Sequence, residues 1–266
     1  MSSLSPSSTA GAAATTAVMA GRTALTLLRS PQVLGIAVLQ ALMFLVMFRY
    51  VIGGAIDLPG VTYVSYVVPG LVVAGLLFTA GGSAVAVAEE AASGLYDRLR
   101  SLPVPGRAVL GGRAVADAAL MVAIGTITLL VGFAVGFRVD GGAAGLVGAF
   151  ALLVAYSLAI ACIFVWVGLV AGSAQAAQGL GLLSIPFSFL SSAFVPVDTL
   201  PTVLRLFAEV QPLTMMVNAW RGLLLGDQMI ATLDHSLGYY VTGSLLWSLA
   251  LVAVATPLAV RAYRSD

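Results

Sequence analysis

Long apolar stretches alternate with short polar ones along this chain of 266 residues. About 20 apolar residues in a helix are enough to cross the hydrocarbon core of a bilayer, which is about 30 Å thick. The pattern therefore predicts an all-α integral membrane protein with six transmembrane helices, the fifth bent or broken near Pro186. The predicted spans are about 31–52, 66–88, 114–137, 143–170, 178–195 and 240–260.

The segment 89–105, between the second and third spans, is the densest charged stretch of the chain. Leu95, Leu99 and Leu102 are spaced i, i+4 and i+7, so they share one side of a helix. Pro103 and a second proline two residues later would end this helix. The pattern predicts a short amphipathic helix where membrane, water and a partner meet. Its polar side carries Glu90, Ser93, Asp97, Arg100 and Ser101.

The segment 196–238, before the last span, is too long for a tight turn and too apolar for a plain loop. Its pieces 201–209 and 213–226 have helical periodicity but are too short to span a bilayer. They predict a re-entrant or interfacial helix pair on the outer side. At the other end of the chain, residues 1–17 are rich in Ser, Thr, Ala and Gly and predict a disordered tail. Residues 18–30 are interpreted as an interfacial helix.

The positions of the arginines predict the orientation, because cytoplasmic segments of membrane proteins are enriched in basic residues. All 12 basic residues of the chain are arginines. With the N-terminus inside, eight fall in cytoplasmic segments and four in outer ones, so both termini and the segment 89–105 are predicted to be cytoplasmic. The inner group is Arg22, Arg29, Arg98, Arg100, Arg107, Arg113, Arg261 and Arg264, and the outer group is Arg49, Arg138, Arg205 and Arg221.

The composition supports a membrane protein and excludes several functions. Hydrophobic residues make up 60% of the chain and charged residues only 9%, against about 25% in soluble domains. A net charge of +1 without a basic tract predicts no nucleic-acid partner. Cys162 and His235 are the only residues of their types, which argues against a metal centre built from them. The chain has no lysine, so it contains no lysine-bearing phosphate loop for ATP.

Several charged residues allow two interpretations. Glu89 and Glu90 either contact a partner or mark the membrane border. Arg113 and Asp117 are four residues apart on a predicted helix and are expected to pair. The alternative for Asp117 is a buried carboxylate that relays protons. His235 is interpreted as a surface residue of an outer loop.

Two separated motifs resemble the ABC-2 type exporter permeases, and more closely their daunorubicin-resistance branch. The first is E-E-x-x-x-G-x-x-D-R-L-R-S-L-P-V from Glu89, followed by G-G-R-x-x-A-D, which ends at Asp117. The second begins at Ser191 with S-S-A-F-V-P-V-D-x-L-P and continues with Q-P-L-T and N-A-x-R-G-L-L-L-G, which ends at Gly226. The similarity covers about residues 20–262.

The resemblance implies a six-helix transmembrane domain over residues 18–262, located in the bacterial plasma membrane with both termini in the cytoplasm. The loop after the second span would supply a coupling helix that docks on a separate ATP-binding subunit. The outer helix pair would form a gate, although Asn218 stands where relatives often have an acid. The implied coupling residues are Glu89, Glu90, Gly94, Asp97, Arg98, Leu99, Arg100, Leu102 and Pro103, and the implied gate residues are Phe194, Pro196, Pro201, Pro212, Asn218, Arg221 and Gly226.

The resemblance also implies the partners. Two permease copies, or one copy and a paralogue, would face each other around a path, and each would dock on one of two ATP-binding subunits. ATP and magnesium would be held by those subunits, so no cofactor is expected on this chain. The remaining contacts would be with membrane lipid and with an amphipathic substrate.

The predicted function is the permease subunit of an ATP-driven exporter for amphipathic or lipid-like compounds, and not an enzyme. The alternative is a permease for polysaccharide or lipid-linked glycan. Aromatic residues, which stack on sugars, make up 8% of the chain without forming a stripe, and this favours a drug, antibiotic or lipid. An ion-coupled carrier would need several intramembrane acids, and an intramembrane enzyme would need paired catalytic groups; the sequence shows neither pattern.

Overall fold

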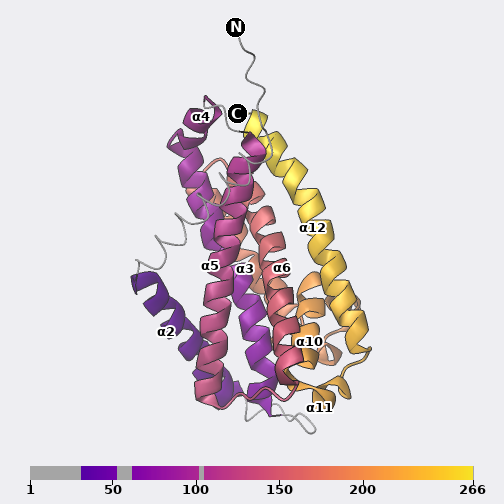
Figure 1. The fold of residues 1–266 in the computed structure, drawn as a ribbon. Helices are drawn as coiled ribbons and strands as arrows, with labels where there is room; N and C mark the ends of the chain where they lie inside the picture. The colour runs from indigo at the N-terminus through magenta and orange to yellow at the C-terminus, as the bar shows by residue number, and fades with distance from the viewer. Residues whose placement is uncertain (1–30, 53–61, 102–104, 266) are drawn as a thin grey trace.

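The computed structural model describes residues 31–52, 62–101 and 105–265, which form a bundle of long helices (Figure 1). These ranges contain no strand, as the all-α prediction requires. The predicted tail at 1–17 and interfacial helix at 18–30 lie outside them. The elements are α2 (Pro31–Met47), η1 (Phe48–Ile52), α3 (Tyr63–Ala92), α4 (Leu95–Arg100), α5 (Gly106–Val135), α6 (Gly142–Val170), α7 (Ala174–Leu182), α8 (Ser184–Phe189), η2 (Val197–Thr199), α9 (Thr202–Val210), α10 (Pro212–Leu225), α11 (Asp227–Ile230) and α12 (Leu237–Ser265).

Four of the described helices, α3, α5, α6 and α12, are long and apolar enough to cross a membrane. They coincide with the second, third, fourth and sixth predicted spans. The first predicted span corresponds to α2, which has 17 residues, continued by the π-helical turn η1. The fifth corresponds to α7 and α8, with nine and six residues. The helix breaks at Leu183 because Pro186 has no N–H to donate to the carbonyl of Leu182.

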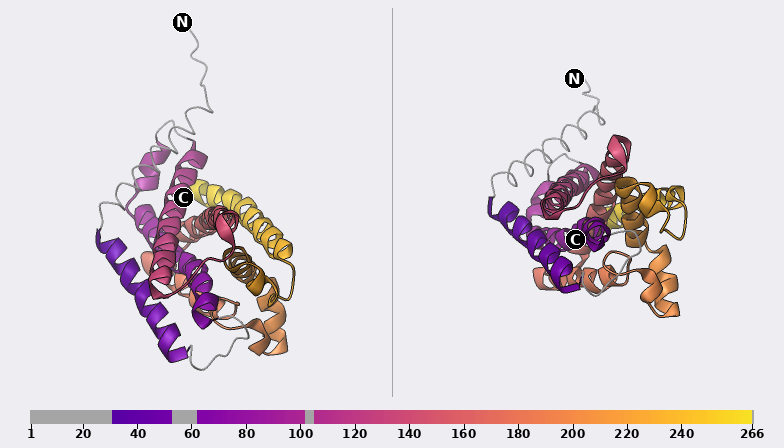
Figure 2. Two further views of the ribbon diagram at one scale, coloured as in Figure 1. Left: turned by 60° about the horizontal axis from the view of Figure 1, so that its bottom comes forward. Right: turned by 90° about the horizontal axis from the view of Figure 1, so that it is seen from below.

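Helix α3 lies inside the bundle, where it contacts α5, α6, α7 and α10. Every residue of 66–74, a run of more than two helical turns, is buried, as expected for a helix that is apolar on all sides. Figure 2 shows α2 on one flank of the bundle and α12 on the other. The environment of α3 is therefore protein on most sides, whereas α2 and α12 carry many exposed apolar side chains.

The C-terminal end of α10 docks on the beginning of α6 through backbone contacts. The amides of Asp140 and Gly141 both donate to the carbonyl oxygen of Leu224, each at 2.9 Å. A Cβ atom at Gly141 or Gly145 would lie 1.9 or 2.1 Å from the carbonyl oxygen of Leu223. Small residues at these positions therefore allow the two helices to approach closely.

Trp220 provides a test of this contact, because its Nε1 donates to the carbonyl oxygen of Ala149 at 2.7 Å inside the protein. Replacing Trp220 with Phe should lower the unfolding free energy by about 1–2 kcal/mol, since the hydrogen bond and part of the ring volume are lost. Thermal unfolding in detergent micelles measures the change, and Trp166→Phe on α6 is the matched control. Equal midpoints for wild type and Trp220→Phe would contradict this prediction.

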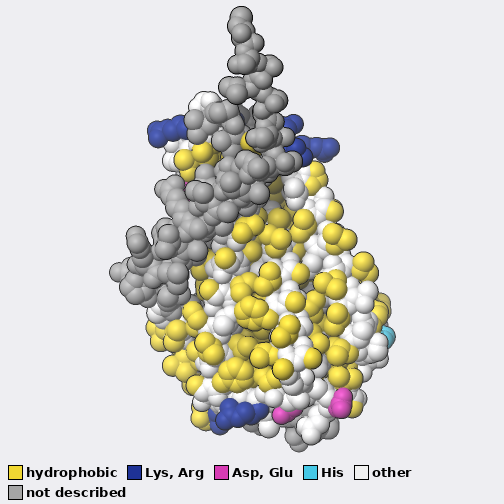
Figure 3. All heavy atoms as spheres, in the orientation of Figure 1, with side chains coloured by type: hydrophobic (Ala, Val, Ile, Leu, Met, Phe, Trp, Pro, Cys, Tyr) yellow, Lys and Arg dark blue, Asp and Glu magenta, His cyan; other side chains and the backbone are white. Residues whose placement is uncertain are grey.

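The surface carries the pattern of a protein surrounded by lipid. In the view of Figure 3, apolar side chains cover the middle of the visible face, and the charged side chains gather toward its two ends. Exposed apolar residues on α2, α8 and α12, such as Met43, Ile185 and Leu249, contribute to this belt. Contact with acyl chains removes these side chains from water without a protein partner.

Candidate functional site

The end of α3 and the helix α4 form a charged corner at one end of the bundle (Figure 1). Glu89 and Glu90 lie in the last turn of α3, which ends at Ala92. The chain then turns at Gly94, whose φ of 72° is a left-handed conformation that glycine adopts without steric cost. The single amphipathic helix predicted here is therefore wrong: residues 89–100 belong to two helices joined by this turn.

Arg113 of α5 connects the charged corner to the bundle. Its Nη1 lies 2.6 Å from Oε2 of Glu90, and its Nε lies 2.9 Å from Oδ2 of Asp117. The side chain of Asp117 is 5% exposed and that of Arg113 is 16% exposed, so water screens their attraction only weakly. The predicted pairing of Arg113 with Asp117 is confirmed, whereas the sequence did not predict the second pair with Glu90.

Tyr96 of α4 completes this cluster. Its hydroxyl donates to Oε2 of Glu90 at 3.0 Å, and its ring packs edge-on against Tyr263 of α12 with centroids 5.8 Å apart. Burial, together with the neighbouring Glu90 carboxylate, raises the pKa of the Tyr96 phenol, so it stays protonated as a donor. A chain of polar contacts therefore leads from Asp117 through Arg113 and Glu90 to α4.

The buried and exposed side chains of α4 differ from those that the sequence predicts. Tyr96 is the buried side chain, whereas Leu95 is exposed and Leu99 is only partly buried against the core. Asp97 and Ser101 are exposed, as the sequence predicted for the polar side, and Arg98, which was not assigned to that side, is exposed as well. The difference arises because the contacts of Tyr96 with Glu90 of α3 and Tyr263 of α12 set which side of α4 is buried, and the spacing of the leucines does not show these contacts.

Arg100 holds α4 against the end of α12. Its guanidinium carbon lies 4.9 Å from the ring centroid of Tyr263, and its Nη1 lies 3.1 Å from Oδ1 of Asp97. The Asp97 side chain is 70% exposed, so this ion pair contributes about 1 kcal/mol at most. Leu102 and Pro103, which the resemblance implies as coupling residues, lie outside the described residues.

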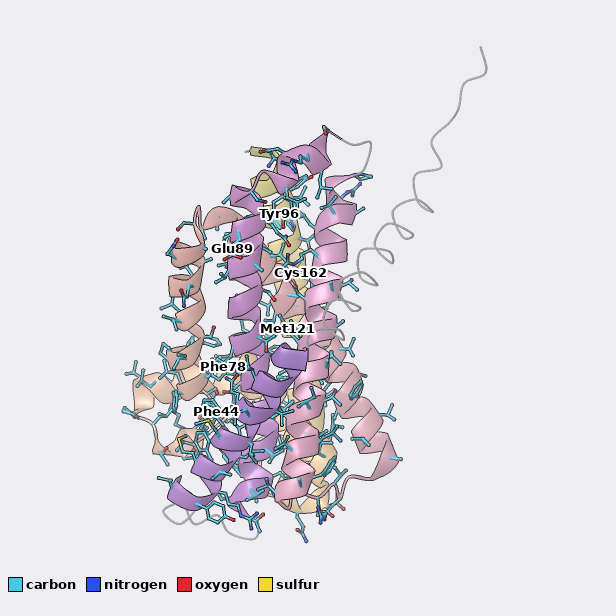
Figure 4. The ribbon with its side chains drawn as sticks, turned by 90° about the vertical axis from the view of Figure 1, so that its left-hand side faces the viewer. Phe44, Phe78, Glu89, Tyr96, Met121 and Cys162 are labelled. Atoms are coloured by element: carbon cyan, nitrogen blue, oxygen red, sulfur yellow. The ribbon has the colours of Figure 1, made fainter. Side chains whose placement is uncertain are left out.

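An apolar groove lies between α2, α3 and α5, and the Arg113–Asp117 pair is part of its lining. This groove has a volume of about 580 Å³. A second groove of about 520 Å³ continues between α3, α7 and α8, and both are lined by Phe44 and Phe78. Figure 4 shows Phe44 and Phe78 near each other, toward the end of the bundle away from Tyr96.

Near the opposite end of the bundle, Arg221 of α10 is only 1% exposed. Its Nε donates to the carbonyl oxygen of Tyr66 at 3.0 Å, and its Nη2 donates to those of Ser192 at 2.6 Å and Ala193 at 3.2 Å. Its Nη1 donates to Oδ1 of Asn218 at 3.0 Å. The guanidinium carbon also lies 3.5 Å from the ring centroid of Tyr66. These partners are all neutral, so the buried charge is stabilised by dipoles and an aromatic face.

Residues 191–194, which we call the outer segment, are held between α3 and α10. The hydroxyl of Tyr66 donates to the carbonyl oxygen of Ser192 at 3.1 Å. The hydroxyl of Ser192 in turn donates to Oδ1 of Asn218 at 3.1 Å. Arg221 therefore lies at the centre of a buried polar cluster that joins three parts of the chain.

The same segment packs closely on α3. A Cβ atom at Gly70 would lie 1.9 Å from the carbonyl oxygen of Ala193, so the two backbones meet with no room for a side chain. Phe194 lies between Phe48, whose ring stacks on it, and Phe189, whose ring is tilted, with both centroid distances at 5.0 Å. The outer segment is thus fixed by polar contacts on one side and by aromatic packing on the other.

The other predicted gate residues lie at helix boundaries. Pro196 and Pro201 flank η2, and Pro212 is the first residue of α10, where its missing N–H leaves no helical bond unmade. Gly226 ends α10 with a φ of 67°. Two short helices, α9 and α10, occupy the positions that the sequence predicted for a helix pair. A cavity of about 280 Å³ lies beside Arg221 and is also lined by Asp198 next to η2 and by Met229 of α11.

The sequence predicts Arg221 in an outer segment and as a gate residue, whereas in the structure its side chain is buried. The sequence does not indicate that Tyr66 and Ser192 are its partners. The sequence did contain a signal that Arg221 could be buried, because it is the only charged residue within the otherwise apolar stretch of α10. His235 is exposed, as predicted, and packs against Tyr239 with tilted rings whose centroids are 4.5 Å apart. In the part of the chain that the structure describes, no cluster of His, Cys, Asp and Glu is suited to a metal ion.

Comparison with known proteins identifies the family to which this chain belongs. The sequence matches the family described as ABC-2 type transporter over residues 15–225. The chain belongs to this family. It is 30% identical over 230 residues to the daunorubicin resistance ABC transporter permease protein DrrB1 of Streptomyces coeruleorubidus, covering 86% of the chain and 78% of that protein. It is 28% identical over 229 residues to the probable doxorubicin resistance ABC transporter permease protein DrrC of Mycobacterium tuberculosis, covering 84% and 79%.

Membership of the ABC-2 type transporter family confirms the resemblance seen in the two sequence motifs. The chain is a multi-pass membrane protein and the permease subunit of an ABC exporter. It is not itself an enzyme, because ATP hydrolysis in this family belongs to a separate ATP-binding subunit. The location of ATP hydrolysis on a separate subunit agrees with the sequence, because this chain has no lysine for a phosphate-binding loop.

Proposed function

We propose that this permease exports amphipathic or lipid-like compounds, such as drugs, antibiotics or lipids, from the cytoplasm or the inner leaflet. The observation that carries the proposal is the groove of about 580 Å³ whose lining is apolar except for a few polar groups. Such a lining suits a molecule with a large apolar body and one polar end. The names of the relatives, which concern resistance to daunorubicin and doxorubicin, support the same class of compound.

The proposed topology has six spans, with α2 and η1 forming the first span and α7 and α8 the fifth. Both termini and α4 then lie in the cytoplasm, and residues 18–262 form the transmembrane domain behind a tail at 1–17. The position of α4 beside the C-terminal end of α12 supports a common side for these elements (Figure 1).

The proposed assembly contains two permease chains, identical or paralogous, and two ATP-binding subunits that hold ATP and magnesium. The grooves beside α2, α7 and α8 would face the second permease, so that the path for the substrate lies between the two chains. Support comes from the exposed apolar side chains of α2 and α8, including Met43 and Ile185, next to these grooves.

The segment 89–103, with α4 at its centre, is proposed as the coupling helix that docks on the ATP-binding subunit. Asp97 and Arg98 are exposed and available to a partner, whereas Tyr96 and Arg100 fix α4 to Tyr263 of α12. A helix held in this way moves together with the spans that it contacts. Closure of the ATP-binding subunits would therefore reorient α3, α5 and α12 together.

The outer segment, together with α9 and α10, is proposed as the gate on the far side of the membrane. The polar cluster around Arg221 would keep it closed, because opening must break bonds from one side chain to three carbonyl groups. These hydrogen bonds form in the closed conformation and break when the outer segment moves away from α3. The gate would then respond to the tilt of α3.

Substitutions in the proposed coupling helix should impair docking or transport and leave membrane insertion unchanged. Asp97→Ala or Arg100→Ala is expected to reduce copurification of the ATP-binding subunit, or to lower export per ATP hydrolysed, by about 10-fold, while the amount of chain in the membrane stays normal. Losing about 1.4 kcal/mol of docking energy gives this factor. Copurification and export of a fluorescent amphipathic dye measure the two effects.

The matched control is Arg138→Ala, which removes an exposed arginine at the far end of the bundle. It is expected to leave both readouts unchanged. Wild-type copurification and wild-type export in both the Asp97 and Arg100 variants would refute the docking assignment. A wild-type complex that exports no amphipathic compound at all would refute the proposed function itself.

A further inference from the structure

We propose that a cavity between α6, α12 and the broken segment α7–α8 binds small uncharged lipophilic compounds that carry a hydroxyl or carbonyl oxygen. We call it the Tyr156 cavity, after the tyrosine of α6 that lines it. It is separate from the two grooves described above, and binding there does not depend on the proposed export function. The proposal follows from a buried hydroxyl without a partner, from the apolar lining around it, and from its depth in the bundle.

The side chain of Tyr156 is fully buried, yet its hydroxyl makes no hydrogen bond with any residue that the structure describes. The hydroxyls of Tyr63 and Tyr66, which are also buried, donate to the carbonyl oxygens of Phe194 and Ser192, each at 3.1 Å. A buried polar group without a partner is costly, so its presence in a folded protein calls for an explanation. An oxygen of a ligand in the Tyr156 cavity would supply the missing partner.

The lining of the Tyr156 cavity suits an uncharged molecule with an apolar body. Among the described residues that form it, none is charged, and only Tyr156 and Ser184 have polar side chains. The hydroxyl of Ser184 already donates to the carbonyl oxygen of Gly181 at 2.6 Å.

The volume of the Tyr156 cavity, about 260 Å³, lies just below the range of about 300–1,000 Å³ that is typical of ligand pockets, so the ligand is small. Water is a poor occupant of this space. Each water molecule takes up about 30 Å³ in the liquid and needs two to four polar partners, which this lining cannot supply to several waters.

Tyr156 lies in the middle of α6, equally far along the helix from Gly142 and Val170. At 1.5 Å per residue, this position is about 21 Å from either end of the helix. The polar groups of phospholipids lie at the borders of a hydrocarbon core that is about 30 Å thick, so they do not reach this depth. The missing partner therefore belongs to a molecule that dissolves in the core and carries its own oxygen. Leu180 and Leu183, which are 43% and 62% exposed, form the apolar mouth of the cavity.

The segment α7–α8 separates the Tyr156 cavity from the second groove. Leu183 and Ser184, at the break, line the cavity, whereas Gly181 and Ile185 line the groove. Here α7 meets α3 without side chains between them, because a Cβ atom at Gly181 would lie 3.1 Å from the Cα atom of Gly81. A ligand in the cavity would fill the space behind the break and hold α7–α8 against α3. If the grooves carry the substrate, as proposed above, the ligand should slow export.

Two compounds of matched shape test the site. In 2-naphthol a hydroxyl stands where 2-methylnaphthalene has a methyl group, and both compounds are uncharged at neutral pH. Their saturable binding is compared on the complete complex in nanodiscs, with each concentration measured in the lipid and with partitioning into empty nanodiscs subtracted. We expect 2-naphthol to bind wild type about 5-fold more tightly, which is the factor that one net hydrogen bond provides.

Tyr156→Phe removes the hydroxyl and keeps the ring, so the variant should bind the two compounds equally. Because the substitution deletes a polar group that is unpaired in the empty cavity, the variant without ligand should unfold at the temperature of wild type or above it. Tyr239→Phe makes the same substitution at an exposed position of α12 and should keep the preference for 2-naphthol. In addition, 2-naphthol should slow export of a fluorescent amphipathic dye by wild type and not by Tyr156→Phe.

Equal binding of the two compounds to wild type, or an unchanged preference for 2-naphthol in Tyr156→Phe, would overturn the proposed site. Selective binding that does not slow export would refute the effect of the ligand on α7–α8. If the complex exports no amphipathic compound at all, the proposed export function fails, and the binding comparison still decides whether the Tyr156 cavity is a site. The two failures are thereby distinguished.

Discussion

Replacing Arg221 with Met is expected to lower the unfolding free energy by about 3 kcal/mol or more. Arg221 donates hydrogen bonds to the carbonyl groups of Tyr66, Ser192 and Ala193 and to the side chain of Asn218. Met fills a similar volume but leaves these oxygens without that donor inside the protein. Each buried polar group that loses its partner costs about 1–3 kcal/mol, and the costs are not fully additive. Thermal unfolding in nanodiscs measures the loss.

Replacing Arg221 with Lys tests whether stability depends on the positive charge alone or also on the planar shape of the guanidinium. A lysine keeps the positive charge but cannot make the same divergent set of planar hydrogen bonds, so we expect an intermediate loss of stability. The matched control is Arg205→Met on α9. Arg205 is partly exposed and pairs with Asp198 and Glu209, so its replacement should barely change the unfolding midpoint.

The Arg221 substitution should also act on the proposed gate. Without the guanidinium, the outer segment keeps its hydrogen bond from Tyr66, the packing of Phe194 and the bonds of Ser192 to Asn218 and Thr214, but it loses the two hydrogen bonds that Arg221 donates to its carbonyl groups. Limited proteolysis from the outside should then cut this segment faster than in wild type. A midpoint and a cleavage rate equal to those of wild type would show that the cluster around Arg221 does not hold the segment.

Replacing Arg113 with Met is expected to have the larger effect on transport. It leaves Asp117 and Glu90 near each other without the cation that lies between them. Removing one partner of a buried ion pair costs about 3–5 kcal/mol, because the other charge stays buried and unpaired. The same change interrupts the contacts between the groove and α4. We expect reduced stability together with loss of most substrate-stimulated ATP hydrolysis.

A double substitution separates these two consequences of losing Arg113. Arg113→Met combined with Asp117→Leu removes both members of the most buried pair, and apolar replacements of such pairs are often close to neutral in stability. The double variant should therefore recover most of the lost unfolding free energy and still lack substrate stimulation. Recovery of both properties would show that the cluster stabilises the fold without transmitting anything to α4.

The charged corner illustrates what could be predicted from the sequence. The pairing of Arg113 with Asp117 was predictable because four residues along a helix bring two side chains to the same face. The pairing of Arg113 with Glu90 was not, because it depends on how α3 lies against α5. The turn at Gly94 was also missed, since a helical wheel assumes a continuous helix and glycine can either continue or end one.

Some of the predicted spans also follow from the sequence alone, and others do not. Length and hydropathy sufficed for α3, α5, α6 and α12, because these are properties of consecutive residues. The first and fifth predicted spans correspond to shorter elements. The break at Leu183 between α7 and α8 agrees with the bend predicted near Pro186, because a proline is visible in the sequence. The π-helical turn after α2 was not predicted, since local hydropathy does not register a change of helix type within an apolar stretch.

The sequence by itself determined that this is a helical membrane protein of the ABC-2 type, without a lysine-bearing phosphate loop, that its charges are densest in segment 89–105, and that Arg221 stands alone in an apolar stretch. Only the tertiary structure decided which groups those charges meet. Arg221 and the carbonyl oxygen of Tyr66, for example, are 155 positions apart. The physical reason is that apolar length is encoded in neighbouring residues, whereas the partners of a buried charge are assembled by helix packing from distant parts of the chain.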